Sequence, residues 1–257
     1  MITNGMFYEE LKRKNSYSAE LCDCIENTVQ NLLNNTTSAK KPGMLLGKIQ
    51  SGKTRTFLGI IGLAFDNSFD VTVILTKGTK ALALQTFQRI ENEYSSFQEK
   101  DKIQIFDIMN LPDNLTPYEL SQKIIIIAKK ETHNLQRLYD ALFVTYPQLS
   151  QRNILIIDDE ADLASIGYRR TQEETIEMNR IASQIDEIRG RIRQCSFLEV
   201  TATPYSLYLQ PDDEEMNTIF EPKRPAFTEL VPVHEDYIGG EYYFEMSNQS
   251  DSIASYL

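Results

Sequence analysis

The stretch MLLGKIQSGKTRTFLGIIGLAFD, residues 44–66, joins a short apolar run to a helix-like segment through a loop bounded by two glycines. Residues 44–47 are expected to form a short buried strand, and residues 53–66 carry apolar side chains at helical spacing. Between them, GKIQSGKT fits the pattern G-x-x-x-x-G-K-T. A loop of this kind directs backbone N–H groups at phosphate oxygens, and the following helix adds the positive end of its dipole. The stretch therefore predicts a phosphate-binding loop between a strand and a helix.

The loop residues have separate expected roles. Gly47 ends the strand, and Gly52 opens the turn into the helix. Lys53 is expected to reach the β and γ phosphates of a nucleotide, and the Thr54 hydroxyl to bind Mg²⁺. The alternative is a chance occurrence of the pattern in a lysine-containing turn. The expected nucleotide-binding set from this loop is Gly47, Gln50, Ser51, Gly52, Lys53 and Thr54.

Strand and helix candidates alternate after this loop. The strand candidates are apolar runs at 71–76, 103–108, 123–129, 153–159 and 196–203. The helix candidates lie at 79–97, 116–122, 132–146 and 171–195. Continuous apolar runs are typical of parallel strands covered on both faces, and alternation with helices indicates right-handed βαβ units. We expect one doubly wound α/β domain over residues 41–205, with a mostly parallel sheet flanked by helices.

Two segments flank this predicted domain. Residues 1–40 form an N-terminal segment that is expected to be helical over 6–34, and NNTTSAKKPG then breaks the pattern. Residues 206–257 form an acidic and aromatic extension, in which YIGGEYYFE at 237–245 resembles a hairpin. We expect this extension to be an insertion, a linker or the start of a second domain.

The composition narrows the class of protein. No apolar run approaches the roughly 18 residues of a membrane span, and the first residues contain no apolar signal core, so we expect a cytoplasmic protein. Cys22, Cys24 and Cys195 are an odd number at spacings that suit no metal site, and we expect reduced thiols. The net charge of −11 gives no support to a bulk nucleic-acid-binding surface, although a local basic stripe remains open.

A second motif, ILIIDDEAD at 154–162, ends an apolar strand in a group of carboxylates. Nucleotide hydrolysis needs an acid at such a strand end to hold Mg²⁺ and a neighbour to orient the attacking water. Asp159 suits the metal and Glu160 the water, whereas Asp158 leaves an alternative register open. A solvated acidic turn is the other interpretation, but carboxylates this close repel one another without a cation.

A third, weaker motif is VTATPY at 200–205, which ends the last strand candidate with Thr201 and Thr203. It fits a plain strand exit as well. Its place in the chain, after the loop and the acids, favours a functional role.

Together these residues resemble the first RecA-like domain of superfamily-2 helicases, the DEAD/DEAH-box group, over about residues 44–205. GKIQSGKT resembles motif one, DDEAD motif two and TATP motif three, which links hydrolysis to domain movement in that group. LTKGTKALALQT resembles motif Ia, which faces the nucleic-acid backbone. The sequences QSGKT and ALALQT are also similar to segments of a helicase-like endonuclease family that is named for the Z-one domain and linked to phage defence.

The resemblance implies an ATPase that uses ATP and Mg²⁺, with catalytic roles for Lys53, Asp159 and Glu160. Thr201 and Thr203 would sense the γ-phosphate. Nucleic acid, DNA or RNA, is the implied partner, and the candidates for contacts to its backbone are Lys77, Lys80, Lys129 and Lys130.

This sequence also departs from the family's pattern. Gln30 lies 17 residues before Gly47, near the place of an adenine-reading glutamine, but lacks the expected phenylalanine and proline context. Nothing after residue 205 resembles the second RecA-like domain that supplies arginine fingers, which are worth about 10³ to 10⁵ in rate. We therefore expect weak turnover in isolation and a missing second domain or a protein partner.

Two other functions remain open at this stage. A P-loop switch would bind a protein partner according to its nucleotide state and have no helicase activity, which suits the acidic charge. A metal nuclease using DDEAD would need a further carboxylate and a nearby lysine, and no such arrangement stands out in the sequence.

Overall fold

The computed structural model describes residues 1–38, 41–48, 52–77, 80–159, 172–202 and 224–233. Its centre is a seven-stranded sheet in the order β3-β4-β2-β5-β6-β1-β7, and every printed strand pair is parallel. The strands are β1 (Gly43–Leu46), β2 (Val71–Thr76), β3 (Ile103–Asp107), β4 (Lys123–Lys129), β5 (Asn153–Asp159), β6 (Gln194–Thr201) and β7 (Phe227–Leu230). The predicted doubly wound α/β fold with a parallel sheet is confirmed.

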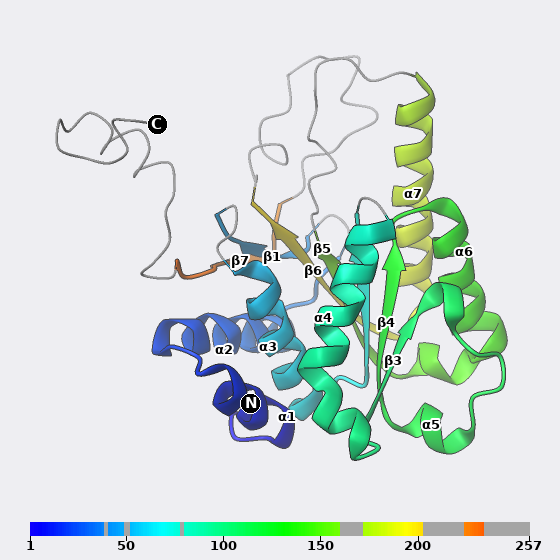
Figure 1. The fold of residues 1–257 in the computed structure, drawn as a ribbon. Helices are drawn as coiled ribbons and strands as arrows, with labels where there is room; N and C mark the ends of the chain where they lie inside the picture. Colours follow the sequence, from blue (N-terminus) through cyan, green and yellow to red (C-terminus); the bar gives the residue numbers. More distant parts are fainter. Residues whose placement is uncertain (39–40, 49–51, 78–79, 160–171, 203–223, 234–257) are drawn as a thin grey trace, which may run out of the picture.

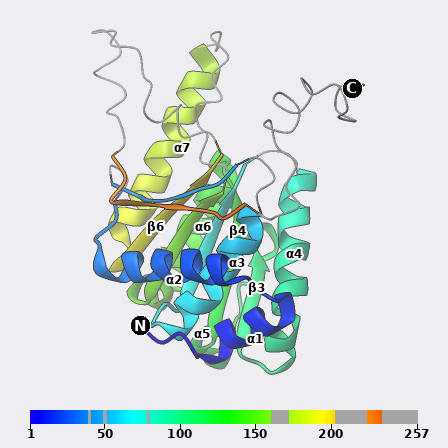
Figure 2. The same cartoon turned by 90° about the vertical axis from the view of Figure 1, so that its left-hand side faces the viewer.

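Helices cover both faces of the sheet (Figures 1 and 2). On one face lie α1 (Met6–Asn15), α2 (Ala19–Asn34), α3 (Lys53–Asp66) and α4 (Lys80–Glu99), whose buried side chains form one apolar cluster with the strands. On the other lie α5 (Pro117–Ser121), α6 (Thr132–Asp140) and α7 (Gln172–Arg191), which form a second cluster. A π-helical turn at Ala141–Thr145 and 3-10 turns at Ile108–Asn110 and Pro147–Gln151 complete the described helical elements.

The N-terminal segment forms two helices that pack directly on α3. Ser16 adopts a left-handed conformation after α1, and the Ser18 side chain accepts a hydrogen bond from Leu21 N to cap α2. Two glycines of α3 allow the close approach. A Cβ at Gly62 would lie 2.4 Å from Leu11 Cδ1 of α1, and one at Gly59 would lie 2.5 Å from Ile25 Cδ1 of α2. Residues before 40 therefore share the core of the sheet domain.

The prediction that 196–203 holds the last strand is wrong, because β7 lies within the extension after residue 205. β7 pairs with β1, and the Phe227 ring covers Gly43, where a Cβ would lie 2.5 Å from Phe227 Cζ. The Glu229 carboxylate accepts a hydrogen bond of 2.9 Å from Asn31 of α2. Only four residues long and alternately exposed, this edge strand gives no continuous apolar run in the sequence.

The described helix and strand bounds otherwise follow the prediction within a few residues. α7 ends at Arg191 and β6 begins at Gln194, so Cys195 belongs to the strand and not to the predicted helix. The predicted hairpin at 237–245 lies outside the described residues. Among the described residues, no helix combines the length and apolarity needed to cross a membrane.

Candidate functional site

The three sequence motifs meet at the carboxyl-terminal edge of the sheet. β1, β6 and β5 are adjacent there, and they end at Leu46, Thr201 and Asp159. Gly47 N donates a 3.0 Å hydrogen bond to Thr201 O, and the register pairs Val200 with Asp159. The phosphate-loop candidate and the acidic strand end therefore lie on the same edge, one strand apart, at the place where open α/β sheets bind ligands.

The described part of the loop has the geometry of a turn into a helix. Gly52 has φ +86°, a left-handed conformation that glycine adopts without strain, and it precedes the first turn of α3. The Lys53 ammonium donates to the carbonyl oxygens of Gly47 at 3.3 Å and Lys48 at 2.9 Å, so this side chain folds back over its own loop. Gln50 and Ser51 lie outside the described residues.

Strand alternation separates the two neighbouring aspartates. Leu155 and Ile157 pack in the cluster of α1 to α4, so Asp159, two residues further, projects to the side of α3 and Thr54. Asp158 projects to the opposite side and is only 2% exposed, whereas Asp159 is half-buried. The structure thus puts Asp159 on the Thr54 side, in the register that the sequence analysis preferred. Glu160 and Thr203 lie outside the described residues.

Asp158 is engaged in a buried ion pair. The Lys130 ammonium lies 2.5 Å from Asp158 Oδ1 and also donates to Asp159 O at 3.1 Å. Both paired side chains are 3% exposed. Lys130 was one of four candidates for contact with a nucleic-acid backbone, and this prediction is wrong because its ammonium is buried in the ion pair with Asp158.

Two other lysines of that set do lie at this edge. Lys77 follows β2 and Lys129 ends β4, and both are half-buried at neighbouring strand ends, since the register pairs Thr76 with Lys129. The Lys80 side chain is outside the described part of the structure.

The cluster around Asp158 has the composition that a nuclease would need, which the sequence did not reveal. Glu199 of β6 is paired in register with Asp158, and Lys130 lies beside Asp158. However, Glu199 is 0% exposed and Asp158 is 2% exposed, so a phosphodiester cannot reach either carboxylate in this arrangement. Within the described ranges, no group of three or more His, Cys, Asp or Glu side chains could hold a metal ion.

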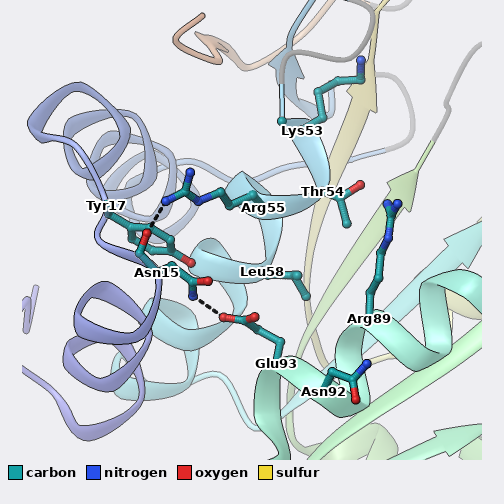
Figure 3. A pocket seen from close by; sticks show the side chains of 10 residues that line it. Asn15, Tyr17, Lys53, Thr54, Arg55, Leu58, Arg89, Asn92 and Glu93 are labelled. Carbon is teal, nitrogen blue, oxygen red and sulfur yellow. Dashed lines mark hydrogen bonds between the residues drawn. The ribbon is translucent and has the colours of Figure 1, made fainter. Parts of the chain in front are cut away.

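A cavity of about 660 Å³ adjoins the loop, between the end of α1, the start of α3 and the middle of α4 (Figure 3). The Arg55 guanidinium lies 5.3 Å from the centre of the Tyr17 ring and donates to Asn15 O. From α4, the Arg89 side chain extends toward Thr54. The cavity is lined by Asn15, Tyr17, Gly52, Lys53, Thr54, Arg55, Leu58, Arg89, Asn92 and Glu93.

Sequence reasoning missed most of this cavity wall. Gln30, whose sequence context did not fit that of an adenine-reading glutamine, lies near the C-terminal end of α2 and donates to Asn34 Oδ1 at 3.0 Å. The break between α1 and α2 was a usable signal, because it places Asn15 and Tyr17 beside the start of α3. Nothing in the sequence pattern marked Arg89 or Glu93, which reach the cavity only through packing of α4.

Burial raises the pKa of one tyrosine near the site and of two cysteines in the core. Burial raises the pKa of Tyr17 above its usual value, so the hydroxyl beside Arg55 remains protonated. Burial raises the pKa of Cys24 and of Cys195 to about 11, and none of the three cysteines forms a disulfide. The free thiols agree with the sequence analysis.

Comparison with known proteins places this geometry in a family. A model for the family described as "Type III restriction enzyme, res subunit" matches residues 15–206. Among curated protein sequences, none is significantly similar to this chain.

The fold is similar to that of solved helicases. The DUF1998 helicase MrfA bound to DNA aligns with a TM-score of 0.53 and 15% identity, covering 88% of this chain and 29% of that one. The structure of MrfA with DNA and AMPPNP aligns with a TM-score of 0.54 and 15% identity, covering 89% of this chain and 29% of that one. The DEAD-box helicase Mss116 bound to ssRNA and UDP-BeF aligns at 0.44 and 14% identity, over 89% of this chain and 46% of that one, which is too weak to carry an argument.

This chain thus spans less than a third of the length of MrfA. The family match covers well over half of the chain, and the parallel sheet agrees with the expected helicase-like architecture. The chain therefore belongs to the family described as type III restriction enzyme, res subunit, and has a helicase-like RecA-like fold.

Proposed function

We propose that this chain is an ATP-binding and ATP-hydrolysing module of a helicase-like motor. One observation carries the proposal: β1, β6 and β5 bring the Lys53 loop, Thr201 and Asp159 to one edge of the sheet, with Asp159 on the side of α3. A hydroxyl and a carboxylate are the oxygen ligands that Mg²⁺ prefers, and the loop with its lysine suits phosphates. The residues present therefore fit Mg-ATP.

In this proposal the residues divide the work of phosphoryl transfer. The turn at Gly52 and the Lys53 ammonium hold the phosphates, while Thr54 and Asp159 bind Mg²⁺, which neutralises charge on the phosphate oxygens. Glu160 orients the attacking water, and Thr203 responds to the γ-phosphate. The Thr201 side chain is 0% exposed and projects to the Asp158 side of the sheet, so its predicted contact with the γ-phosphate is not part of this proposal. On binding, the Lys53 ammonium would exchange its bonds to Gly47 O and Lys48 O for phosphate oxygens.

The cavity beside the loop suits the nucleoside part of the ligand. Its volume of about 660 Å³ lies within the usual range for small-molecule sites, and Lys53 and Thr54 are shared between cavity and loop. Tyr17 offers an aromatic surface there, on which Arg55 already packs. We propose that the base and ribose occupy this cavity.

Calorimetric titration of the full 257-residue chain with Mg-ATP tests this function. We expect measurable binding by the unmodified protein and loss of about 100-fold or more in affinity in Lys53→Ala, since a charged phosphate contact is removed. The matched control is Lys102→Ala, an exposed lysine beside β3 at the opposite edge of the sheet. Absence of Mg-ATP binding by the unmodified protein would refute the proposal.

Nucleic acid is the proposed partner, with DNA first, and the proposed context is restriction or phage defence. The support is the family description, which names a restriction enzyme, and the fold similarity to MrfA, which was crystallised with DNA. Lys77 and Lys129 are the proposed backbone contacts. ATPase rates measured at low salt with single-stranded DNA, duplex DNA and RNA test this proposal. We expect stimulation above the weak rate measured without nucleic acid.

The second candidate is the nucleotide-dependent switch that binds a protein partner. The net charge of −11 favours it, because an acidic surface repels nucleic acid. Mg-ATP binding without stimulation or retention by any of the three nucleic acids would support the switch and exclude the motor.

A further inference from the structure

A single lysine connects three strand ends behind the proposed magnesium site. Lys130 follows β4, and its backbone N–H donates a 2.7 Å hydrogen bond to Thr76 O at the end of β2. Its ammonium reaches beyond β2 to β5, where it contacts Asp158 Oδ1 at 2.5 Å and Asp159 O at 3.1 Å. The ends of β4, β2 and β5 are thus tied together by one residue.

The strand register explains how the side chain crosses. Ala128, Leu75 and Asp158 form one row across β4, β2 and β5. Lys130 lies two residues beyond Ala128, so its side chain emerges on the face that Asp158 occupies. The four-carbon stem then passes over the end of β2 to reach the carboxylate.

The two contacts fix different parts of the acidic strand end. The ion pair holds the Asp158 side chain, while the bond to Asp159 O holds the peptide group that leads to Glu160. These two contacts add to the pairing of Asp159 with Val200 of β6, and together they restrain the direction in which the Asp159 carboxylate leaves the strand.

Stability alone is a weak reason for such a buried pair. Removing two charges from water is costly, and replacing a buried pair by apolar side chains of similar volume is often neutral or stabilising. A role in geometry is the better explanation, because groups behind a metal ligand commonly set its orientation.

We propose that Lys130 is a positioning residue for the magnesium-binding end of β5. It acts through Asp158 and the Asp159 carbonyl, on the opposite side of the strand from the nucleotide. This inference rests on the proposed function, since it assigns Lys130 to the same magnesium site.

The chain contains a matched control at the other end of β4. Lys123 begins that strand, and its ammonium contacts Asp70 Oδ1 at 2.9 Å and Phe69 O at 2.6 Å. Each lysine thus donates to an aspartate carboxylate and to the backbone carbonyl of a residue adjacent to that aspartate. Of these two lysines, Lys130 does so at the proposed nucleotide edge and Lys123 at the opposite one.

The test measures the affinity of the full chain for a fluorescent ATP analogue with Mg²⁺ and with EDTA. The ratio of the two affinities is the magnesium contribution. We expect Lys130→Met to lower this ratio by about tenfold or more, the usual range for loss of a group behind a metal ligand, with the EDTA affinity retained. Lys123→Met should leave the ratio at the wild-type value.

A second variant separates positioning from folding. Lys130→Met/Asp158→Leu removes both charges and should restore the melting temperature, yet its magnesium contribution should stay low because Asp159 O has lost its donor. A wild-type ratio in either Lys130 variant would overturn the inference while leaving the proposed function intact. If the unmodified protein bound the analogue with no magnesium contribution, the proposed magnesium site itself would fail, and this inference with it.

Discussion

The two edges of the sheet use the same charged residues in different ways. At the amino-terminal edge, Asp70 lies before β2 and pairs with Lys123 of β4 at 2.9 Å and with Arg152 before β5 at 3.5 Å. These side chains are 18–33% exposed. At the carboxyl-terminal edge, the Lys130–Asp158 pair is 3% exposed, and Lys53 lies on carbonyl oxygens of its own loop.

Under the proposed function, the carboxyl-terminal edge is where charge serves a ligand, whereas the amino-terminal pairs serve stability alone. The amino-terminal pairs are partly solvated and connect three strands at small net gain. The carboxyl-terminal edge buries one pair completely, which is costly, and presents a lysine, a hydroxyl and a carboxylate on the neighbouring side. The comparison predicts that mutation of the buried pair at the carboxyl-terminal edge lowers stability most, and that nucleotide binding responds to mutation at that edge but not at the amino-terminal one.

The largest expected effect is on the free energy of unfolding. Lys130→Met should lower it by about 3–5 kcal/mol, because Asp158 is left as a buried charge without its ion-pair partner. Lys123→Met should cost about 1 kcal/mol or less, as for exposed pairs. Urea denaturation followed by circular dichroism measures both, and equal losses would mean that burial does not distinguish the two edges.

Asp159→Asn should reduce the magnesium contribution to nucleotide affinity by at least about tenfold, or about 1.4 kcal/mol. The free energy of unfolding should stay within about 0.5 kcal/mol, because Asp159 is half-buried and Asn preserves its shape. Asp107→Asn is the control, because Asp107 ends β3 at the same edge of the sheet. Its Oδ1 accepts a hydrogen bond from Met109 N, and the side-chain oxygen of asparagine can accept the same bond. The analogue titration with and without Mg²⁺ decides, and an equal loss in both variants would point to a general charge effect.

Asp70→Ala should have the opposite profile. It removes the common partner of Lys123 and Arg152, so the free energy of unfolding should fall by about 1 kcal/mol. Nucleotide affinity should remain within twofold of wild type, since the change lies at the far ends of the strands. A marked change in affinity measured by calorimetry would show that the edges are coupled.

The smallest expected effect concerns nucleic acid. Lys129→Ala should weaken DNA binding at all sequences alike and lower the slope of log affinity against log salt by about one, as for loss of one phosphate contact. Lys102→Ala, at the amino-terminal edge, should leave the slope unchanged. Fluorescence anisotropy at several salt concentrations measures it, and identical slopes for both variants would remove Lys129 from the proposed interface.

The sequence predicted those parts of the fold that depend on local pattern. Runs such as IIIIA at 124–128 in β4 and ILII at 154–157 in β5 are apolar on both faces, so their burial in a parallel sheet was predictable. β7 was missed because Phe227–Leu230 is short and alternately exposed, and its place beside β1 depends on the Phe227 ring covering Gly43.

The site shows the same limit. The loop at Gly47–Thr54 and the acids after β5 are contiguous motifs, so both could be found in the sequence. The choice between Asp158 and Asp159 needed the side on which α3 packs, which is a tertiary fact. Lys130 lies 28 residues before its partner Asp158, and no local pattern connects them.

The strand β7 has a practical consequence. Val231 N donates a 2.8 Å hydrogen bond to Leu46 O, so the chain leaves β7 immediately beside the first glycine of the nucleotide loop. Val233 follows and is 42% exposed. A dye attached to a cysteine substituted at Val233 would therefore sit next to the loop and outside the cavity, as an optical reporter that senses loop rearrangement without occupying any position assigned to the ligand.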